Sequence, residues 1–432
     1  MSEVISRRRA LKILGLGAAA LVTGTFSSAC EPIQSNEPLG PTVNKVSFKK
    51  DGIIEVNQKP IFPLGLYYLP GQESLETWQK MGKAGFNLIN QWWINPQTLA
   101  SAEQNNIYTM ACLPYTFPNI DKTGVDPKIV QQLRSSKSFL GYYGADEPDI
   151  TLTRNLYTTS LEKLEHLDPD HPDLTVFAEA PNLPENFPFD TKTARSNYKG
   201  DPGDISELPN DISVNDFDKW YIEKSGTEIV SFDYYDKTDY VGTGDVTRRY
   251  IKSLRTGRYG GDAKAVWVTL SAHSDISRTL KEMRYQAINV IANGATGLLW
   301  WDWPSGCNSK NCSGYVDGNP NGYSTHWDKL LSISKELNLV KDGLIGQEVS
   351  LGQTEPNGAI SYKVTTDANG KFFIFSASNM NADDGSISQN MSGLPKETRF
   401  NVVGENRTLT TDSKGVLTDN FEYLGAQIYV QT

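Results

Sequence analysis

The feature that most constrains this chain is a regular alternation of strand-like and helix-like segments between residues 46 and 340. Short apolar runs predict strands at 61–67, 86–92, 107–113, 139–143, 174–178, 228–234, 265–270 and 296–301. Apolar residues at helical spacing predict helices at 74–84, 96–104, 128–135, 152–167, 216–225, 245–256, 278–293 and 325–337. Eight such units are typical of a (β/α)8 barrel of the TIM type, which usually needs about 250 residues.

An open, doubly wound sheet is the alternative arrangement of the same units. No G-x-G-x-x-G follows the first strand, which weighs against a dinucleotide-binding fold. Residues 46–60 predict a β-hairpin ahead of the barrel, with its turn at 49–52. After residue 340, short alternating runs predict a small antiparallel β-sandwich over 341–432. Its strands are expected at 359–365, 371–377, 400–403, 407–410, 416–418 and 426–430.

Composition excludes several classes of protein. The 432 residues carry 41 Lys and Arg against 51 Asp and Glu, a net charge of −10. Nucleic-acid phosphates would be repelled by this acidic chain, so we expect no nucleic-acid partner. The one apolar run that approaches membrane length is N-terminal, which excludes a polytopic membrane protein.

The N-terminus reads as an export signal. Residues 6–12, Ser-Arg-Arg-Arg-Ala-Leu-Lys, resemble a twin-arginine motif and precede a short apolar run at 13–26. Cys30 follows small residues, as in a lipoprotein signal, so we expect residues 1–30 to be removed up to an acylated Cys30. The alternative is cleavage after Ala29 with Cys30 unmodified. Residues 31–45 then form a tether, and the protein is exported, with a lipid anchor as its only membrane attachment, or secreted.

The other cysteines point to structure rather than to a cofactor. Cys307 and Cys312 enclose four polar residues, and in an exported protein a local disulfide is expected there. Cys112 lies in an apolar run and is expected to be a buried thiol. Four histidines leave little material for a zinc site, so we expect neither metal nor cofactor.

Aromatic and carboxylate side chains gather where the predicted strands end, which is where barrel active sites lie. Each alone has a plainer explanation, since a single Trp usually packs and a carboxylate after a strand often caps a helix. Their recurrence at most of the eight ends favours a site for sugar rings and acid/base chemistry. The candidates are Tyr67, Trp92, Trp93, Tyr143, Asp146, Glu147, Glu179, Asn182, Asp233, Tyr235, His273, Trp301, Asp302 and Trp303.

Four phrases make a family resemblance specific. Residues 143–149, Tyr-Gly-Ala-Asp-Glu-Pro-Asp, resemble the acid/base segment of (β/α)8 glycoside hydrolases of the large retaining clan, several of whose families carry Asp-Glu-Pro there. Residues 284–303 are similar to the seventh helix and eighth strand of these enzymes, and residues 61–67 and 82–88 also fit. The resemblance covers residues 46–340. It implies that Glu147 is the general acid, a role that requires a raised pKa.

The sequence departs from the clan at two places. Asp146 stands where the clan usually has Asn, which binds the sugar 2-hydroxyl, so the role of Asp146 is open. The clan nucleophile is a Glu at the end of the seventh strand, but residues 266–273 contain no carboxylate. We favour Asp233 as the second carboxylate, because it directly ends an apolar strand. Glu179 and Asp302 are alternatives.

Two further explanations of the missing Glu stay open. Glu282 or Asp275 could fold back into the site, although Glu282 with Arg284 also reads as a structural pair. Alternatively, the protein has lost hydrolysis and only binds glycans. A barrel hydrolase for another ester or amide is a distant third, unsupported by a G-x-S-x-G motif or a metal cluster. Whether the protein cleaves glycans or only binds them, the expected partner is a glycan.

Overall fold

The computed structural model describes residues 42–68, 75–91, 94–116, 125–148, 164–177, 213–234, 251, 263–272, 278–301, 325–349, 360–378 and 385–432. The predicted signal peptide, the tether as far as residue 41, and both cysteines of the predicted disulfide lie outside these residues. None of the described helices is long and apolar enough to cross a membrane.

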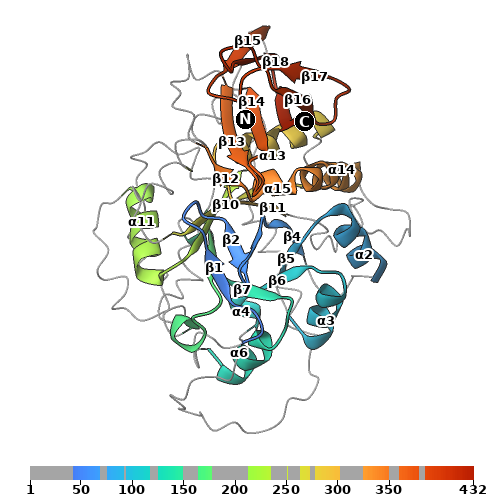
Figure 1. Ribbon diagram of the computed structural model, residues 1–432. Helices are drawn as coiled ribbons and strands as arrows, with labels where there is room; N and C mark the ends of the chain where they lie inside the picture. The colour runs from blue at the N-terminus through green and yellow to red at the C-terminus, as the bar shows by residue number, and fades with distance from the viewer. Residues whose placement is uncertain are drawn as a thin grey trace, which may run out of the picture.

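Eight parallel strands close into a barrel, in the order β10-β11-β4-β5-β6-β7-β8-β9 (Figure 1). The predicted fold class is therefore confirmed, because an open sheet would leave two edge strands unpaired. The barrel strands are β4 (Leu64–Tyr68), β5 (Leu88–Gln91), β6 (Tyr108–Cys112), β7 (Phe139–Asp146), β8 (Asp173–Phe177), β9 (Ile229–Tyr234), β10 (Ala265–Ser271) and β11 (Gly297–Trp301).

The helices begin where the sequence supplies a cap. Asn95 and Asp126 each accept a backbone N–H of the first turn and are each followed by a proline, which has no N–H to lose at that position. Ser213 and Thr279 form capping boxes with acidic residues three positions later. The described helices around the barrel are α2 (Leu75–Ala84), α3 (Pro96–Gln104), α4 (Leu113–Thr116), α6 (Pro127–Arg134), α11 (Val214–Ser225), α13 (Leu280–Ala292) and α14 (Thr325–Leu339).

Alternation along the strands separates an inner core from an outer one. Because side chains of a strand alternate between its two faces, residues two apart share a face. All eight strands contribute to one apolar cluster, which must therefore fill the barrel; its members include Tyr67, Leu88, Met110, Leu140, Leu174, Ile229, Trp267 and Leu299. Neighbours of opposite parity pack outward against the helices, among them Leu66, Ile89, Phe232, Val268 and Trp300.

A three-stranded sheet covers the amino end of the barrel. It consists of β1 (Val46–Phe48), β2 (Ile54–Val56) and β3 (Lys59–Ile61), and in Figure 1 it lies across the middle of the barrel. Side chains of β1 and β2 join the inner core. We predicted a single hairpin here. The third strand arises because Asn57 and Gln58 adopt positive φ, which makes a second tight turn.

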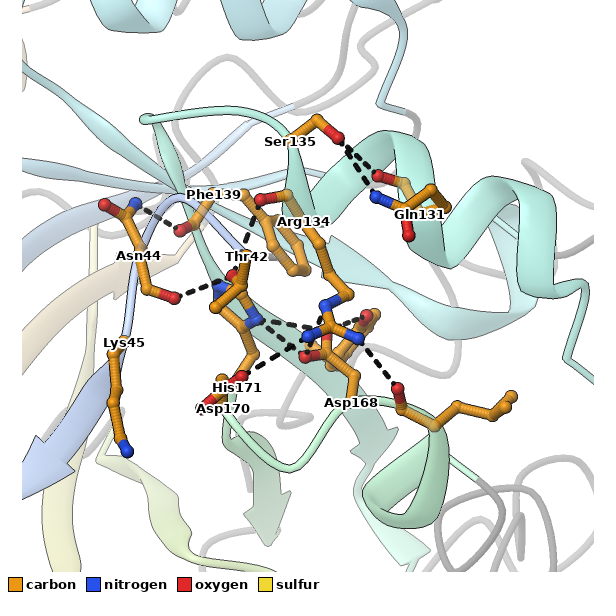
Figure 2. A network of polar contacts seen from close by, with 12 residues as sticks. Thr42, Asn44, Lys45, Gln131, Arg134, Ser135, Phe139, Asp168, Asp170 and His171 are labelled. Atoms are coloured by element: carbon orange, nitrogen blue, oxygen red, sulfur yellow. Dashed lines mark hydrogen bonds and ion pairs between the residues drawn. The ribbon is translucent and has the colours of Figure 1, made fainter. Parts of the chain in front are cut away.

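A buried polar network fastens the same end (Figure 2). The Asp168 carboxylate accepts a hydrogen bond from the Tyr142 hydroxyl at 2.6 Å and contacts Nδ1 of His171 at 2.9 Å. Nε of Arg134 lies 3.3 Å from the same carboxylate, and another guanidinium nitrogen lies 3.3 Å from Asp170. Contacts at the amino end contribute to stability, because barrel chemistry takes place at the other end.

The C-terminal residues form two antiparallel sheets. The larger has the order β12-β13-β14-β19-β16-β17 and the smaller pairs β15 with β18. Their strands are β12 (Gln347–Glu348), β13 (Ile360–Thr366), β14 (Phe372–Ser378), β15 (Ser386–Met391), β16 (Arg399–Val402), β17 (Thr408–Thr410), β18 (Leu417–Glu422) and β19 (Ala426–Gln431). Both sheets contribute to one apolar cluster, which confirms the predicted two-layer β domain. Strand β15 was not predicted, because most of its side chains are polar and only two are buried.

The β domain packs on the barrel through α13, and the short helix α15 (Lys341–Leu344) precedes it (Figure 1). Tyr285 of α13 donates to the carbonyl of Ser378 at 2.7 Å, and Phe373 and Phe375 of β14 belong to the same apolar cluster as the outer face of the barrel. The two parts of the molecule therefore share one core.

Candidate active site

The inside of the barrel changes from apolar to polar along the strands. At the amino end the inward residues are apolar, such as Leu88, Leu174 and Ile229. At the carboxyl end, most positions of the same parity are polar or aromatic, although Cys112 of β6 and Val176 of β8 belong to the inner core. The polar and aromatic inward residues are Tyr67, Asn90, Tyr143, Asp146, Ser231, Asp233, Thr269, Ser271 and Trp301. We refer to this set as the barrel mouth.

Glu147 follows the last residue of β7 and is only 4% exposed. Its backbone N–H donates to the carbonyl of Val176 at 2.6 Å, which extends the pairing of β7 with β8 by one residue. Its φ is +49°, a left-handed conformation that costs a non-glycine residue free energy. Strain of this kind at a buried carboxylate is typical of functional sites. A register shift between Tyr143 and Ala145 accompanies it, and bulges re-aim side chains beside active sites.

Asp146 faces the barrel interior, since it pairs in register with the inward Val176. Its carboxylate accepts a short hydrogen bond from the Tyr143 hydroxyl, and the Tyr143 ring meets the Tyr67 ring edge-on with centroids 5.7 Å apart. The structure thus brings Tyr67, Tyr143 and Asp146 together, from β4 and β7. A carboxylate oxygen is an acceptor, which is what the contact with the Tyr143 hydroxyl requires.

Asp233 is fully buried and faces the interior. It has the parity of Ile229, an inner-core residue, whereas Phe232 and Tyr234 pack outward. Its neighbour in register on β10 is Thr269, whose hydroxyl bonds that of Ser231 at 3.0 Å. Asp233 therefore occupies an inward position near the carboxyl end of β9.

Glu282 occupies a different environment. It lies partly buried in the first turn of α13, where its carboxylate accepts the Thr279 backbone N–H at 2.5 Å in a capping box. The predicted pairing of Glu282 with Arg284 was wrong. Arg284 bonds Glu336 of α14 at 2.6 to 3.1 Å and also donates to the carbonyl of Ala426. Residues two apart on a helix point in different directions, which is why the pair does not form.

Trp301 is partly buried and faces the interior, as its register with the inward Ser271 requires. Trp300 points outward and meets Phe86 edge-on, with ring centroids 6.0 Å apart. Of the two aromatic rings, Trp301 is therefore the one available to a ligand in the barrel mouth. Trp300 is a packing residue.

Three polar residues of the mouth were not predicted, because they lie inside their strands rather than at the strand ends. Asn90, Ser231 and Thr269 are at most 1% exposed. Asn90 lies two residues after Leu88 of the inner core, so its position on the inward face could have been inferred from the alternation. Cys112 also lies on the inward face as a buried free thiol, as expected.

Several predicted site residues lie outside the described residues. They are Trp92, Trp93, Glu179, Asn182, Tyr235, His273, Asp275, Asp302 and Trp303. Within the described part of the chain, no group of three or more His, Cys, Asp or Glu is placed to hold a metal ion. The inward positions that the structure does describe combine carboxylates, aromatic rings and neutral polar groups, a set suited to hydroxyl-rich ligands and to proton transfer.

Comparisons with known proteins find similar solved structures but no matching sequence. No protein-family model and no curated protein sequence matches the chain. Among solved structures, a glucosidase from Croceicoccus marinus is similar over 86% of this chain and 95% of its own, with 8% identity and a TM-score of 0.48. An α-amylase from Anoxybacillus is similar over 89% of this chain and 99% of its own, with 7% identity and a TM-score of 0.48. N2152 from Neocallimastix frontalis is similar over 90% of this chain and 96% of its own, with 10% identity and a TM-score of 0.47. Since these TM-scores lie below 0.5, the assignment of the barrel rests on the strand pairing of this chain.

Proposed function

We propose that this protein is a glycoside hydrolase that cleaves a polysaccharide or oligosaccharide by carboxylate acid/base catalysis. The observation that carries the proposal is Glu147, a buried carboxylate held in a left-handed backbone directly after β7. It lies at the carboxyl end of the barrel, the end at which barrel enzymes carry out their chemistry. Asp146 and Asp233 turn inward at the same end.

In this proposal Glu147 protonates the glycosidic oxygen as its bond to the anomeric carbon breaks. Asp233 is the second carboxylate, which either attacks the anomeric carbon or removes a proton from the attacking water. The aromatic rings of Tyr67, Tyr143 and Trp301 provide apolar surfaces for the sugar faces. Glu179 and Asp302 remain the alternative second carboxylates. Glu282 is the weakest candidate, because its carboxylate caps α13.

A second function is favoured by one observation. The inward residues at the end of β10 are Thr269 and Ser271, so this strand presents neither Asp nor Glu where the resembled clan has its nucleophile. A protein with this barrel that binds glycans without cleaving them is therefore the alternative. In either case we propose export, with Cys30 acylated; a Cys30→Ala variant should then lose incorporation of a palmitate analogue.

The experiment compares residues 31–432 with two variants on a panel of neutral and acidic polysaccharides and aryl glycosides. Glu147→Gln removes the acid and keeps the shape of the side chain. Glu103→Gln is the matched control, because Glu103 is exposed on α3. We expect sugar release by the wild type and by Glu103→Gln, and none by Glu147→Gln. Equal turnover in all three proteins would refute the assignment of Glu147, whereas glycan binding without turnover would favour the alternative.

A further inference from the structure

One side chain of the barrel mouth has polar atoms that form no hydrogen bond with the described residues. Asn90, on β5, is 1% exposed, and neither its Oδ1 nor its Nδ2 has a hydrogen-bond partner among the described residues. Buried polar groups are nearly always bonded, and leaving both ends of an amide unsatisfied destabilises the fold. Packing alone therefore does not explain the buried amide of Asn90.

The direction of this amide follows from the strand pairing. Asn90 is in register with Tyr67 of β4 and Met110 of β6, and both of these belong to the inner core. Ile89, of opposite parity, packs outward against the helices. The amide of Asn90 is therefore aimed into the barrel. It lies beside Tyr67, whose ring meets Tyr143, the residue that holds Asp146.

The charge of the mouth restricts what can enter it. Asp146 and Asp233 face inward and Glu147 follows β7, and none of the inward positions that the structure describes on the eight strands is Lys or Arg. A carboxylate or sulfate on the ligand would meet like charges, and the described inward positions offer no basic side chain to compensate them. The hydroxyls of an uncharged sugar both donate and accept, which is what an amide requires.

We propose that Asn90 binds a hydroxyl group of the substrate through its carboxamide, and that the sugar it binds is uncharged rather than a uronate or a sulfated sugar. Asn90 is then a specificity-determining residue of the barrel mouth. This inference rests on the proposed function, since it assumes that a glycan enters the mouth.

A nearby asparagine supplies the matched control. Asn87 directly precedes β5, and its amide is bonded at both ends: Oδ1 accepts the Leu64 N–H at 2.8 Å, and Nδ2 donates to the Phe62 carbonyl at 2.9 Å. Leu has nearly the shape of Asn without its polar groups. Asn87→Leu should therefore lower the melting temperature. Asn90→Leu should leave it unchanged or raise it, because a buried unsatisfied amide is replaced by an apolar side chain.

The test measures thermal melting and kcat/KM for both variants, the wild type and Glu147→Gln. The substrates are neutral polysaccharides (β-glucan, xylan, galactomannan) and anionic ones (polygalacturonate, alginate), with affinity electrophoresis in the same polysaccharides as the binding readout. We expect wild-type activity or binding on a neutral glycan only. Asn90→Leu should lose about 10- to 100-fold in kcat/KM or affinity while melting no lower than the wild type.

The outcomes separate this inference from the proposed function. If Asn90→Leu keeps wild-type kcat/KM while Glu147→Gln is inactive, the hydrolase stands and the role of Asn90 is refuted. If Asn90→Leu melts lower than the wild type and retains its activity, the amide satisfies a buried water instead, which also refutes the inference. Preference for polygalacturonate or alginate refutes the uncharged sugar. If no glycan of the panel is cleaved or bound, both the function and the inference fail.

Discussion

Replacing Asp168 by Asn should destabilise the protein strongly, because Asp168 is the centre of the network at the amino end of the barrel (Figure 2). The carboxylate is fully buried and is contacted by Tyr142, His171 and Arg134 at 2.6, 2.9 and 3.3 Å. Burial, and secondarily the charge of Asp168, raises the pKa of the Tyr142 hydroxyl, so this group remains a donor at any pH of the assay. An Asn side chain would turn an NH₂ group toward one of these donors.

The size of the stability loss follows from the partners that Arg134 keeps in the variant. The Arg134 side chain is only 7% exposed and would retain Asp170, at 3.3 Å, and the Leu167 carbonyl, at 3.0 Å. Removing one partner of a buried ion pair costs about 3–5 kcal/mol. With an unfolding entropy of about 2.1 cal/mol/K per residue, the 432 residues give about 0.9 kcal/mol/K. The melting temperature should therefore fall by about 3–6 °C.

The assay is thermal melting followed by circular dichroism, with Asp170→Asn as the control. Asp170 contacts the same arginine but is 23% exposed, so its replacement should cost less than about 1 kcal/mol. Melting of Asp168→Asn within 1 °C of the wild type would contradict the reasoning. So would an equal loss in Asp170→Asn, which would show that burial of the carboxylate does not set the cost.

Four other replacements test separate features of the structure and of the proposed mechanism. Burial raises the pKa of Asp173 from 3.8 to about 7, so its contribution to stability is present below about pH 4 and is lost as pH rises to about 7. Asp173→Asn should therefore be more stable than the wild type at pH 8, by up to about 4 kcal/mol, with the difference shrinking toward pH 4 in urea titrations. Gly297→Ala would place a Cβ 2.7 Å from the buried Trp267 ring and should cost about 1–3 kcal/mol in the same titrations. Asp233→Asn should abolish sugar release while Glu282→Gln retains it; the reverse result would exchange their roles.

The sequence predicted the barrel well because its strands are buried on both faces and its helices carry strong caps. Each of the eight strands lies within a few residues of its expected place. The polar strand β15 and the turn at Asn57–Gln58 were missed, because the first lacks an apolar pattern and the second depends on backbone conformation.

The candidate site was predictable only in part. The motif around Glu147 indicated the residue, but its left-handed backbone and the bulge before it follow from packing of β7 against β8. Which of Trp300 and Trp301 faces inward depends on register, which a sequence without an assigned barrel does not set. Asn90 was not predicted because it lies inside a strand rather than after it.

Comparing two leaving groups shows whether Glu147 acts as the general acid. A polysaccharide leaving oxygen must be protonated as its bond breaks, whereas a 2,4-dinitrophenolate leaves without a proton. We expect Glu147→Gln to lower turnover of the polysaccharide about 10²- to 10⁴-fold and to slow bond cleavage of the matching 2,4-dinitrophenyl glycoside far less. Equal losses on both substrates, or no loss on the polysaccharide, would contradict this role of Glu147.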